Sequence, residues 1–205
     1  SGVINTGDIM YDAVLRNIGL AKKRYANGAW LAKLREENGE LPRLKEKEYY
    51  LATIHRAENT DNSRKIHDIF SAFGKLDKPV LLPLHPRTRK LIDEQNITMN
   101  NIIVVKPVSY LLMLYLTANA YMVVTDSGGL QQEAYFLQTP CTTLRDQTEW
   151  VETLENGWNM LSPIDMDEII RITGRDLNCL QSPQPQLFGD GYAAEYICQA
   201  IIDGS

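Results

Sequence analysis

Short apolar runs alternate with longer amphipathic segments along most of the chain. The apolar runs predict strands at residues 49–54, 79–84, 102–105, 121–124, 141–144 and 158–161. The segments between and after them predict helices at residues 62–76, 86–95, 109–119, 130–137, 149–155 and 165–173. Several strands are apolar throughout, a pattern typical of strands buried on both faces of a parallel sheet. The sequence therefore predicts a Rossmann-like, doubly wound α/β fold with a parallel sheet.

The two ends of the chain depart from this alternation. Residues 8–37 have helical spacing without a preceding strand. A polar, proline-containing stretch at residues 181–186 precedes a last predicted helix at residues 191–202. A first helix without a strand of its own suggests that the chain begins within a longer protein.

Composition is ordinary for one globular domain, with 205 residues, 44% hydrophobic residues and a net charge of −5. Because no basic stripe is present, binding to nucleic acid through its phosphates is not expected. The longest apolar region, residues 110–124, is interrupted by Thr117 and Asn119. It predicts a buried helix and strand rather than a membrane span, so we expect no membrane partner.

The cysteines give no sign of disulfide bonds or of a metal centre. Cys141, Cys179 and Cys198 are widely separated and form no C-x-x-C or Cys/His cluster, which supports neither a disulfide framework nor a zinc site. No signal peptide is visible. We expect reduced thiols in a cytoplasmic protein that uses no metal or other cofactor.

The most informative stretch runs from Thr125 to Glu133, with the sequence TDSGGLQQE. It follows an apolar strand and opens a helix. Free N–H groups near Ser127, Gly128 and Gly129 would therefore form an anion site at the positive end of the helix dipole. Glu133 lies about one turn further on and can accept hydrogen bonds from hydroxyl groups. This combination predicts a nucleotide ligand, and the alternative is a tight turn with a surface glutamate.

Other residues suited to binding also follow strands. Positions just after a predicted strand are occupied by His55, His85, Val108, Ser127 and Arg145. The carboxyl ends of parallel strands meet at one edge of a sheet, where folds of this class bind ligands. We therefore expect these residues to lie along the same edge.

The sequence HRAEN at residues 55–59 contains two groups suited to a phosphate. Arg56 carries a planar fork of donors, and His55 can donate to a phosphoryl oxygen or move a proton near neutral pH. The alternative is a loop in which Arg56 and Glu58 cap neighbouring helices. His67 falls inside a predicted helix and is expected to be structural or exposed.

The sequence RDQTEW at residues 145–150 connects a strand to a helix. Arg145 is expected to pair either with an anion or with Glu133, and Thr148 or Asp146 is expected to cap the helix. Trp150 either lines a pocket wall or packs in the core.

Several common catalytic arrangements are absent from the sequence, including a Ser-His-Asp order, a G-x-G-x-x-G motif and a P-loop. Three carboxylates lie near the candidate site, Glu58, Asp126 and Glu133. We interpret them as binding or structural groups rather than as a proton-transfer pair.

Six motifs occur in order: GDIMYD at 7–12, HRAEN at 55–59, LHPRT at 84–88, TDSGG at 125–129 with Glu133, RDQTEW at 145–150 and FGDG at 188–191. Together they resemble the C-terminal half of UDP-N-acetylglucosamine 2-epimerases of the non-hydrolysing type, over nearly the whole chain. The resemblance implies the second domain of a GT-B architecture, in which UDP-sugar binds between two Rossmann-like domains. It implies a UDP-binding domain at residues 3–190 and a crossover helix at residues 191–203, directed toward an N-terminal domain outside this chain.

The resemblance also implies roles for individual residues. Ser127, Gly128 and Gly129 would hold the diphosphate of UDP or a UDP-N-acetylhexosamine, and Glu133 would hold the ribose. His55 would lie at the phosphate and the reacting centre, as the catalytic candidate. The family reaction eliminates UDP to a glycal and adds it back, which interconverts UDP-GlcNAc and UDP-ManNAc.

The base is implied to bind largely to backbone between Val108 and Met113. Met113 and Trp150 depart from the residues common in the family, an aromatic and an arginine, although tryptophan occurs in a subgroup. Further substrate-binding candidates are Arg56, His85, Arg145 and Trp150. The acidic residues for the C2 proton belong to the first domain, so we expect UDP binding without turnover by this chain, and a homodimer of the full-length protein.

Other functions remain open at this point. The full-length protein is alternatively a hydrolysing epimerase, which releases UDP and free N-acetylmannosamine, or another GT-B enzyme such as a glycosyltransferase. A third possibility is a non-catalytic module that senses nucleotides. The sequence leaves the sugar substituents at C3, C4 and C6 undefined, as well as activation by UDP-GlcNAc.

Overall fold

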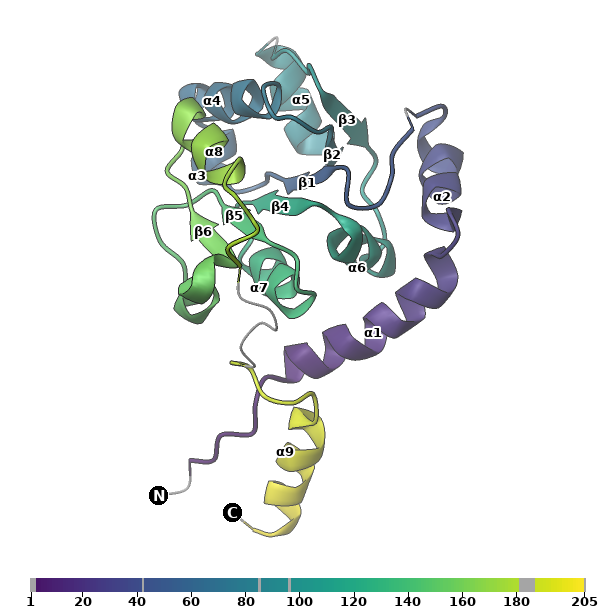
Figure 1. The fold of residues 1–205 in the computed structure, drawn as a ribbon, viewed down its shortest axis with the longest axis vertical. Helices are drawn as coiled ribbons and strands as arrows, with labels where there is room; N and C mark the ends of the chain where they lie inside the picture. Colours follow the sequence, from purple (N-terminus) through teal and green to yellow (C-terminus); the bar gives the residue numbers. More distant parts are fainter. Residues whose placement is uncertain (1–2, 42, 85, 96, 181–186, 205) are drawn as a thin grey trace.

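The computed structural model describes residues 3–204 apart from 42, 85, 96 and 181–186. His85 and the polar stretch at residues 181–186 therefore lie outside the described residues. Six strands of the described part form a parallel sheet in the order β3-β2-β1-β4-β5-β6 (Figure 1). The strands are β1 (Tyr50–Thr53), β2 (Val80–Pro83), β3 (Ile102–Val105), β4 (Met122–Thr125), β5 (Cys141–Thr143) and β6 (Asn159–Leu161). The predicted doubly wound, Rossmann-like fold is confirmed.

Helices pack against both faces of this sheet (Figure 1). One face is covered by α4 (Ser63–Phe73), α5 (Pro86–Glu94) and α8 (Met166–Thr173). The other face is covered by α1 (Ile9–Tyr25), α2 (Ala29–Asn38), α6 (Tyr110–Asn119) and α7 (Gly128–Phe136). Two short helices, α3 (Ala57–Thr60) and the 3-10 helix η1 (Val151–Gly157), lie in loops, and α9 (Ala193–Ile202) is the last helix.

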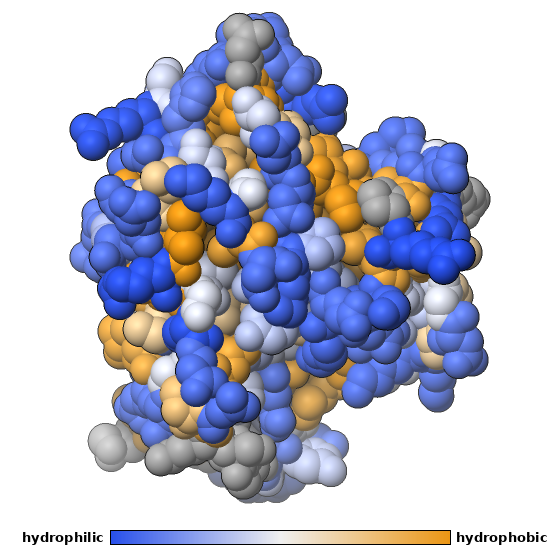
Figure 2. Space-filling view, turned by 45° about the horizontal axis from the view of Figure 1, so that its top comes forward, coloured by the Kyte–Doolittle hydropathy of each residue, from blue (hydrophilic) through white to orange (hydrophobic). Residues whose placement is uncertain are grey.

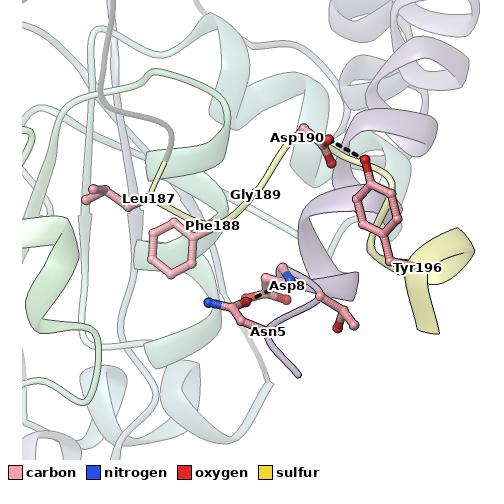
Figure 3. A pocket seen from close by; sticks show the side chains of 9 residues that line it. Asn5, Asp8, Leu187, Phe188, Gly189, Asp190 and Tyr196 are labelled. Carbon is pink, nitrogen blue, oxygen red and sulfur yellow. Dashed lines mark hydrogen bonds between the residues drawn. The ribbon is translucent and has the colours of Figure 1, made fainter. Parts of the chain in front are cut away.

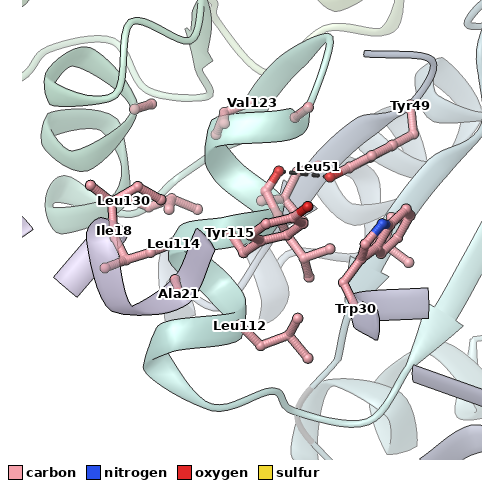
Figure 4. Packing of buried hydrophobic residues seen from close by; sticks show 14 of the residues in the cluster. Ile18, Ala21, Trp30, Tyr49, Leu51, Leu112, Leu114, Tyr115, Val123 and Leu130 are labelled. Atoms are coloured by element: carbon pink, nitrogen blue, oxygen red, sulfur yellow. Dashed lines mark hydrogen bonds between the residues drawn. The ribbon is translucent and has the colours of Figure 1, made fainter. Parts of the chain in front are cut away.

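Alternate strand residues enter two separate hydrophobic cores. In β1, Leu51 joins the core beneath α1, α6 and α7, whereas Tyr50 and Ala52 join the core beneath α4, α5 and α8. Figure 4 shows the first core, which contains Leu51 and Val123 of the sheet and helical residues such as Ile18. Burial on both faces explains why several of these strands carry long apolar runs instead of an alternating pattern.

Serine side chains cap two of the helices that leave the sheet. Ser109 Oγ accepts from Leu112 N at 3.4 Å, and Ser127 Oγ accepts from Leu130 N at 3.3 Å. The start of α6 agrees with the helix predicted at residues 109–119, whereas α7 begins at Gly128, two residues before its predicted start. The cap satisfies a first-turn donor, and glycine weakens a helix mainly in its interior.

The connection after β5 also differs in detail from its prediction. The helix predicted at residues 149–155 is the 3-10 helix η1, at Val151–Gly157. The helical geometry is broken near the end of η1, where Asn156 and Gly157 have φ values of 60° and 74°.

The segments at residues 7–8 and 188–190 cross beside the start of α1. Asp8 N donates to Phe188 O at 2.9 Å, and a Cβ on Gly189 would lie 3.1 Å from Gly7 Cα. Gly7 and Gly189 both have positive φ, 85° and 96°, so two backbones approach here in conformations that favour glycine. A cavity of about 580 Å³ lies at this crossing, where Asp190 accepts from the Tyr196 hydroxyl (Figure 3).

Helix α9 starts from this crossing and extends away from the sheet (Figure 1). The Asp12 carboxylate of α1 accepts from the backbone N–H groups of Ala193 at 3.2 Å and Ala194 at 2.8 Å. Ile201 and Ile202 are 72% and 77% exposed. Helix α9 is therefore bonded to α1 at its first turn, and its far end presents apolar side chains.

The molecular surface is mostly polar in the view of Figure 2, with apolar patches between hydrophilic side chains. Within the described ranges, no helix combines the length and the apolar character needed to cross a membrane.

Candidate functional site

The sheet has a topological switch point between β1 and β4. The chain proceeds outward from β1 to β2 and β3, and from β4 in the opposite direction to β5 and β6. The loops at the carboxyl ends of β1 and β4 therefore diverge, and ligands of such folds bind in the crevice between them. Thr53 and Thr125 are partners in register, so His55 and Ser127 follow neighbouring strand ends. Val108 and Arg145 follow β3 and β5 at the same edge, as expected.

A buried carboxylate joins the two loops at the switch point. Asp126 is 0% exposed, and its carboxylate accepts from His55 N at 3.2 Å, Arg56 N at 3.0 Å and Asn59 Nδ2 at 3.1 Å. These bonds fix the loop after β1 against the end of β4. Asp126 is thus a structural group, in agreement with its interpretation from the sequence.

The His55 ring is held at one nitrogen. Its Nδ1 lies 3.4 Å from Oδ1 of Asp126, and its side chain is 55% exposed. This contact leaves Nε2 for a ligand. Arg56 Nη1 lies 3.7 Å from Oε1 of Glu58, both partly solvent-exposed, so this pair adds little stability. Arg56 precedes α3 without a side-chain capping bond, so the capping alternative lacks support at this residue.

The first turn of α7 opens at the same edge. Ser127 N donates to Thr125 Oγ1 at 2.9 Å, and the Ser127 side chain caps Leu130 N. The N–H groups of Gly128 and Gly129 lie in the first turn, where a helix offers no internal acceptor. Gly129 is exposed, and Ser127 and Gly128 are partly exposed. The geometry predicted for an anion site is therefore present.

Arg145 pairs with a carboxylate other than the one considered from the sequence. Its Nη1 donates to Oε2 of Glu149 at 2.8 Å, whereas Glu133 has a different partner. A Cβ on Gly128 would overlap the Glu149 carboxylate, so this side chain lies against the start of α7. A hydrogen bond from the backbone N–H of Glu149 lowers the pKa of its carboxyl the most, and Arg145 and Arg56 lower it further. Burial opposes this shift.

Glu133 lies further along α7 and is partly buried. Burial raises the pKa of Glu133, and a hydrogen bond from the Tyr110 hydroxyl lowers it by less. Burial and Glu133 together raise the pKa of Tyr110 to about 12. Tyr110 is the first residue of α6, so this bond joins α6 to the helix that carries the candidate phosphate site.

Two residues bound the region in which the resemblance implies recognition of the base. Val108 and Met113 are partly buried and pack against the core beneath α1, α6 and α7. Met113 N donates to Ser109 O at 2.8 Å, and Met113 O accepts from Thr117 Oγ1 at 2.9 Å. Because the backbone of Met113 is occupied within α6, the backbone of Val108 is the better candidate for base recognition.

Trp150 is partly buried and contacts an aromatic ring from the segment before α9. Its ring meets Phe188 edge to face at a centroid distance of 6.2 Å. Thr148 Oγ1 accepts from Trp150 N at 3.1 Å, so Thr148 stabilises the turn before η1, in partial agreement with the predicted cap. His67 is exposed on α4, as expected.

A buried polar network lies behind the first turn of α7 and has no counterpart in the sequence-based expectations. Gln131 is 0% exposed, and its Oε1 accepts from Thr148 Oγ1 at 2.8 Å, Asn159 Nδ2 at 3.1 Å and Thr143 Oγ1 at 3.3 Å. The network joins α7, β5, β6 and the loop that carries Glu149. A glutamine among apolar helix residues is the signal that was available for it.

Two of the candidate cations face the same hollow. A cavity of about 410 Å³ is lined by the cations Arg56, Arg145 and Lys65, and also by the acidic side chains Glu58 and Asp146. Within the described residues, no group of three or more His, Cys, Asp and Glu side chains is arranged to hold a metal ion. The edge therefore combines an open helix start with several positive side chains, a setting suited to an anionic ligand.

A family model described as UDP-N-acetylglucosamine 2-epimerase matches residues 1–202. The chain belongs to the UDP-N-acetylglucosamine 2-epimerase family. It is 38% identical, over 98% of its length and 55% of the relative, to a UDP-N-acetylglucosamine 2-epimerase homolog of Methanococcus maripaludis. It is 36% identical, over 97% of its length and 52% of the relative, to UDP-2,3-diacetamido-2,3-dideoxy-D-glucuronate 2-epimerase of Pseudomonas aeruginosa.

Solved structures of the family share the fold. The UDP-GlcNAc 2-epimerase of Methanocaldococcus jannaschii aligns with a TM-score of 0.80 and 33% identity, over 97% of this chain and 55% of that one. A crystal structure of that enzyme in complex with UDP-GlcNAc and UDP aligns with a TM-score of 0.75 and 32% identity, over 97% of this chain and 54% of that one. This family member spans about half the length of the curated relatives it matches.

Proposed function

We propose that this chain is the UDP-binding half of an epimerase that interconverts UDP-GlcNAc and UDP-ManNAc. The observation that carries the proposal is the open first turn of α7 at the switch point, in a chain of the epimerase family. The structure of the Methanocaldococcus jannaschii relative in complex with UDP-GlcNAc and UDP supports this choice of ligand.

The proposed ligand runs along the start of α7. The N–H groups at Gly128 and Gly129 and the Ser127 side chain bind the diphosphate, and Glu133 accepts from the ribose hydroxyls. His55 faces the phosphate and the reacting centre from the other side of the crevice. Arg56 and Arg145 supply positive charge, with His85 as a further substrate contact, and Val108 recognises the base through its backbone.

In this role the chain acts on the leaving group. Elimination of UDP places negative charge on the diphosphate, and donors that are already oriented stabilise such charge most effectively. The proton at C2 is removed and returned by acidic residues of an N-terminal half. This chain alone therefore binds UDP and does not turn over.

That second half is a Rossmann-like N-terminal domain in a GT-B arrangement. Residues 3–190 form the UDP-binding domain, and the helix at residues 191–203 crosses toward the other half. The exposed apolar end of α9, at Ile201 and Ile202, supplies a surface for this contact. The full-length enzyme is proposed to be a cytoplasmic homodimer.

A second candidate substrate follows from one relative. The Pseudomonas aeruginosa protein is named for a UDP-sugar that carries an acetamido group at C3 and a carboxylate at C6. Because such groups would lie away from the diphosphate, the residues proposed to bind UDP would serve either sugar.

Calorimetric titration with UDP and UDP-GlcNAc tests the proposal. We expect wild type to bind UDP, and Glu133→Ala to lose about 1–3 kcal/mol of binding free energy through a broken ribose hydrogen bond. The exposed Glu152→Ala is the matched control and should retain wild-type affinity. Equal affinity in Glu133→Ala would remove Glu133 from the site, and epimerase turnover by the 205-residue chain would contradict its role as a half-site.

A further inference from the structure

The Glu149 carboxylate meets two positive features of the candidate phosphate site at once. Oε1 lies so close to the start of α7 that a Cβ on Gly128 would overlap it. Oε2 accepts from Arg145 Nη1 at 2.8 Å. A carboxylate is favourable at a helix N-terminus because of the helix dipole. Glu149, which also accepts from its own backbone N–H, therefore resembles a bound anion in its position beside the first turn of α7 and in its pairing with Arg145.

The loop around Glu149 is anchored, but the carboxylate itself is not enclosed. Thr148 Oγ1 donates to the fully buried Gln131 at 2.8 Å, and Trp150 N donates to Thr148 Oγ1. The Glu149 side chain is 49% exposed, whereas that of Arg145 is 12% exposed. The carboxylate can therefore swing into solvent while Arg145 keeps its position at the site.

We propose that Glu149 is an internal stand-in for the ligand phosphate, which a nucleoside diphosphate displaces when it binds. In the free chain Glu149 neutralises Arg145 and the start of α7. On binding, the diphosphate takes over both partners, and Glu149 turns outward. The inference rests on the proposed function, because it assumes that a nucleoside diphosphate binds at the first turn of α7.

The direction of the effect separates this role from two others. A stand-in competes with the ligand, so removal of its charge tightens diphosphate binding. A Glu149 that contacted the ligand, or that only positioned the loop, would weaken binding when changed. The low pKa of Glu149 means that the competition operates at neutral pH.

The test is calorimetric titration of UDP into the 205-residue chain and two variants of equal charge. Glu149→Gln should bind UDP about tenfold more tightly than wild type, which corresponds to about 1.4 kcal/mol. Glu152→Gln, an exposed change three residues further on, should stay within about twofold of wild type, since its charge lies off the site. Uridine, which lacks phosphates, should bind wild type and Glu149→Gln equally.

Each outcome bears on one of the two proposals. If wild type binds UDP and Glu149→Gln binds it equally or more weakly, the stand-in role is overturned and the proposed function is not. Absence of UDP binding by wild type and both variants overturns the proposed function and the stand-in role with it. If circular dichroism shows that Glu149→Gln is poorly folded, Glu149→Ala is held to the same criterion.

Discussion

Removal of the Asp126 carboxylate tests how the switch point is held together. Asp126→Ala leaves three donors without their acceptor, namely His55 N, Arg56 N and Asn59 Nδ2. An unsatisfied buried donor costs about 1–3 kcal/mol, and the two backbone groups are only partly buried, so about 1 kcal/mol for each is appropriate. We therefore expect the free energy of unfolding to fall by about 3 kcal/mol.

Thermal and urea unfolding measure this loss directly. For a chain of this size 1 kcal/mol shifts Tm by about 2–4 °C, so Asp126→Ala should lower Tm by about 6–12 °C. Asp146→Ala removes an exposed carboxylate after the neighbouring strand and should change the unfolding free energy by less than about 0.5 kcal/mol. Asp126→Asn keeps one acceptor oxygen and should fall between the two.

The refuting result is equal stability of Asp126→Ala and Asp146→Ala. It would mean that the loop after β1 is held by something other than this carboxylate. Because the same bonds position His55 and Arg56, folded Asp126→Ala at low temperature should also bind UDP more weakly than wild type.

Two further predictions concern stability. Glu133→Gln should raise Tm at pH 7. Burial raises the pKa of the Glu133 carboxyl in the folded chain, so protonation of this group stabilises the fold at low pH and that contribution is lost as pH rises through the raised pKa. Glutamine is neutral at every pH and does not lose it. The difference in Tm between the variant and wild type should vanish near pH 4, where the Glu133 carboxyl of wild type is largely protonated. If wild type were instead more stable than Glu133→Gln at pH 7, the hydrogen bond from Tyr110 would outweigh the cost of burial. Gly189→Ala should cost about 1–3 kcal/mol in urea unfolding, since φ is 96° and the added Cβ meets Gly7 Cα. Gly19→Ala, in mid-helix with no neighbour within 4 Å of the added Cβ, should instead increase the free energy of unfolding by up to about 1 kcal/mol. If both alanine variants changed the stability equally, close backbone packing between Gly7 and Gly189 would not be the cause.

The fold was predictable because its strands are buried on both faces. Uninterrupted apolar runs such as the one at β3 identify a parallel sheet without knowledge of its partners. Capping is equally local, so Ser109 could be recognised at the start of α6. The strand order, in contrast, depends on contacts between segments far apart in the chain, and periodicity carries no information about it.

The same limit applies to the candidate site. The positions of Ser127 and His55 after strands follow from local sequence, and the sheet brings them together. The hydrogen-bond partners of nearby side chains do not follow from local sequence. In the structure Arg145 pairs with Glu149, four residues along the same connection, and not with Glu133. Tyr110 meets Glu133 because α6 and α7 pack together, which no spacing in the sequence indicates.

Asp126, Glu133 and Glu149 differ in what would have to change for a ligand to bind. Asp126 is fully buried and bonded to backbone, so exchange of its partners would require the loop after β1 to open. Glu149 has a guanidinium partner and lies half in solvent, and Glu133 accepts from a tyrosine hydroxyl. Partner exchange at Glu149 and Glu133 therefore costs least, and it would release Arg145 and the start of α7 to a diphosphate and the Glu133 carboxylate to ribose. Asp126 would keep the scaffold unchanged throughout, so binding at the candidate site needs movements of side chains rather than of the sheet.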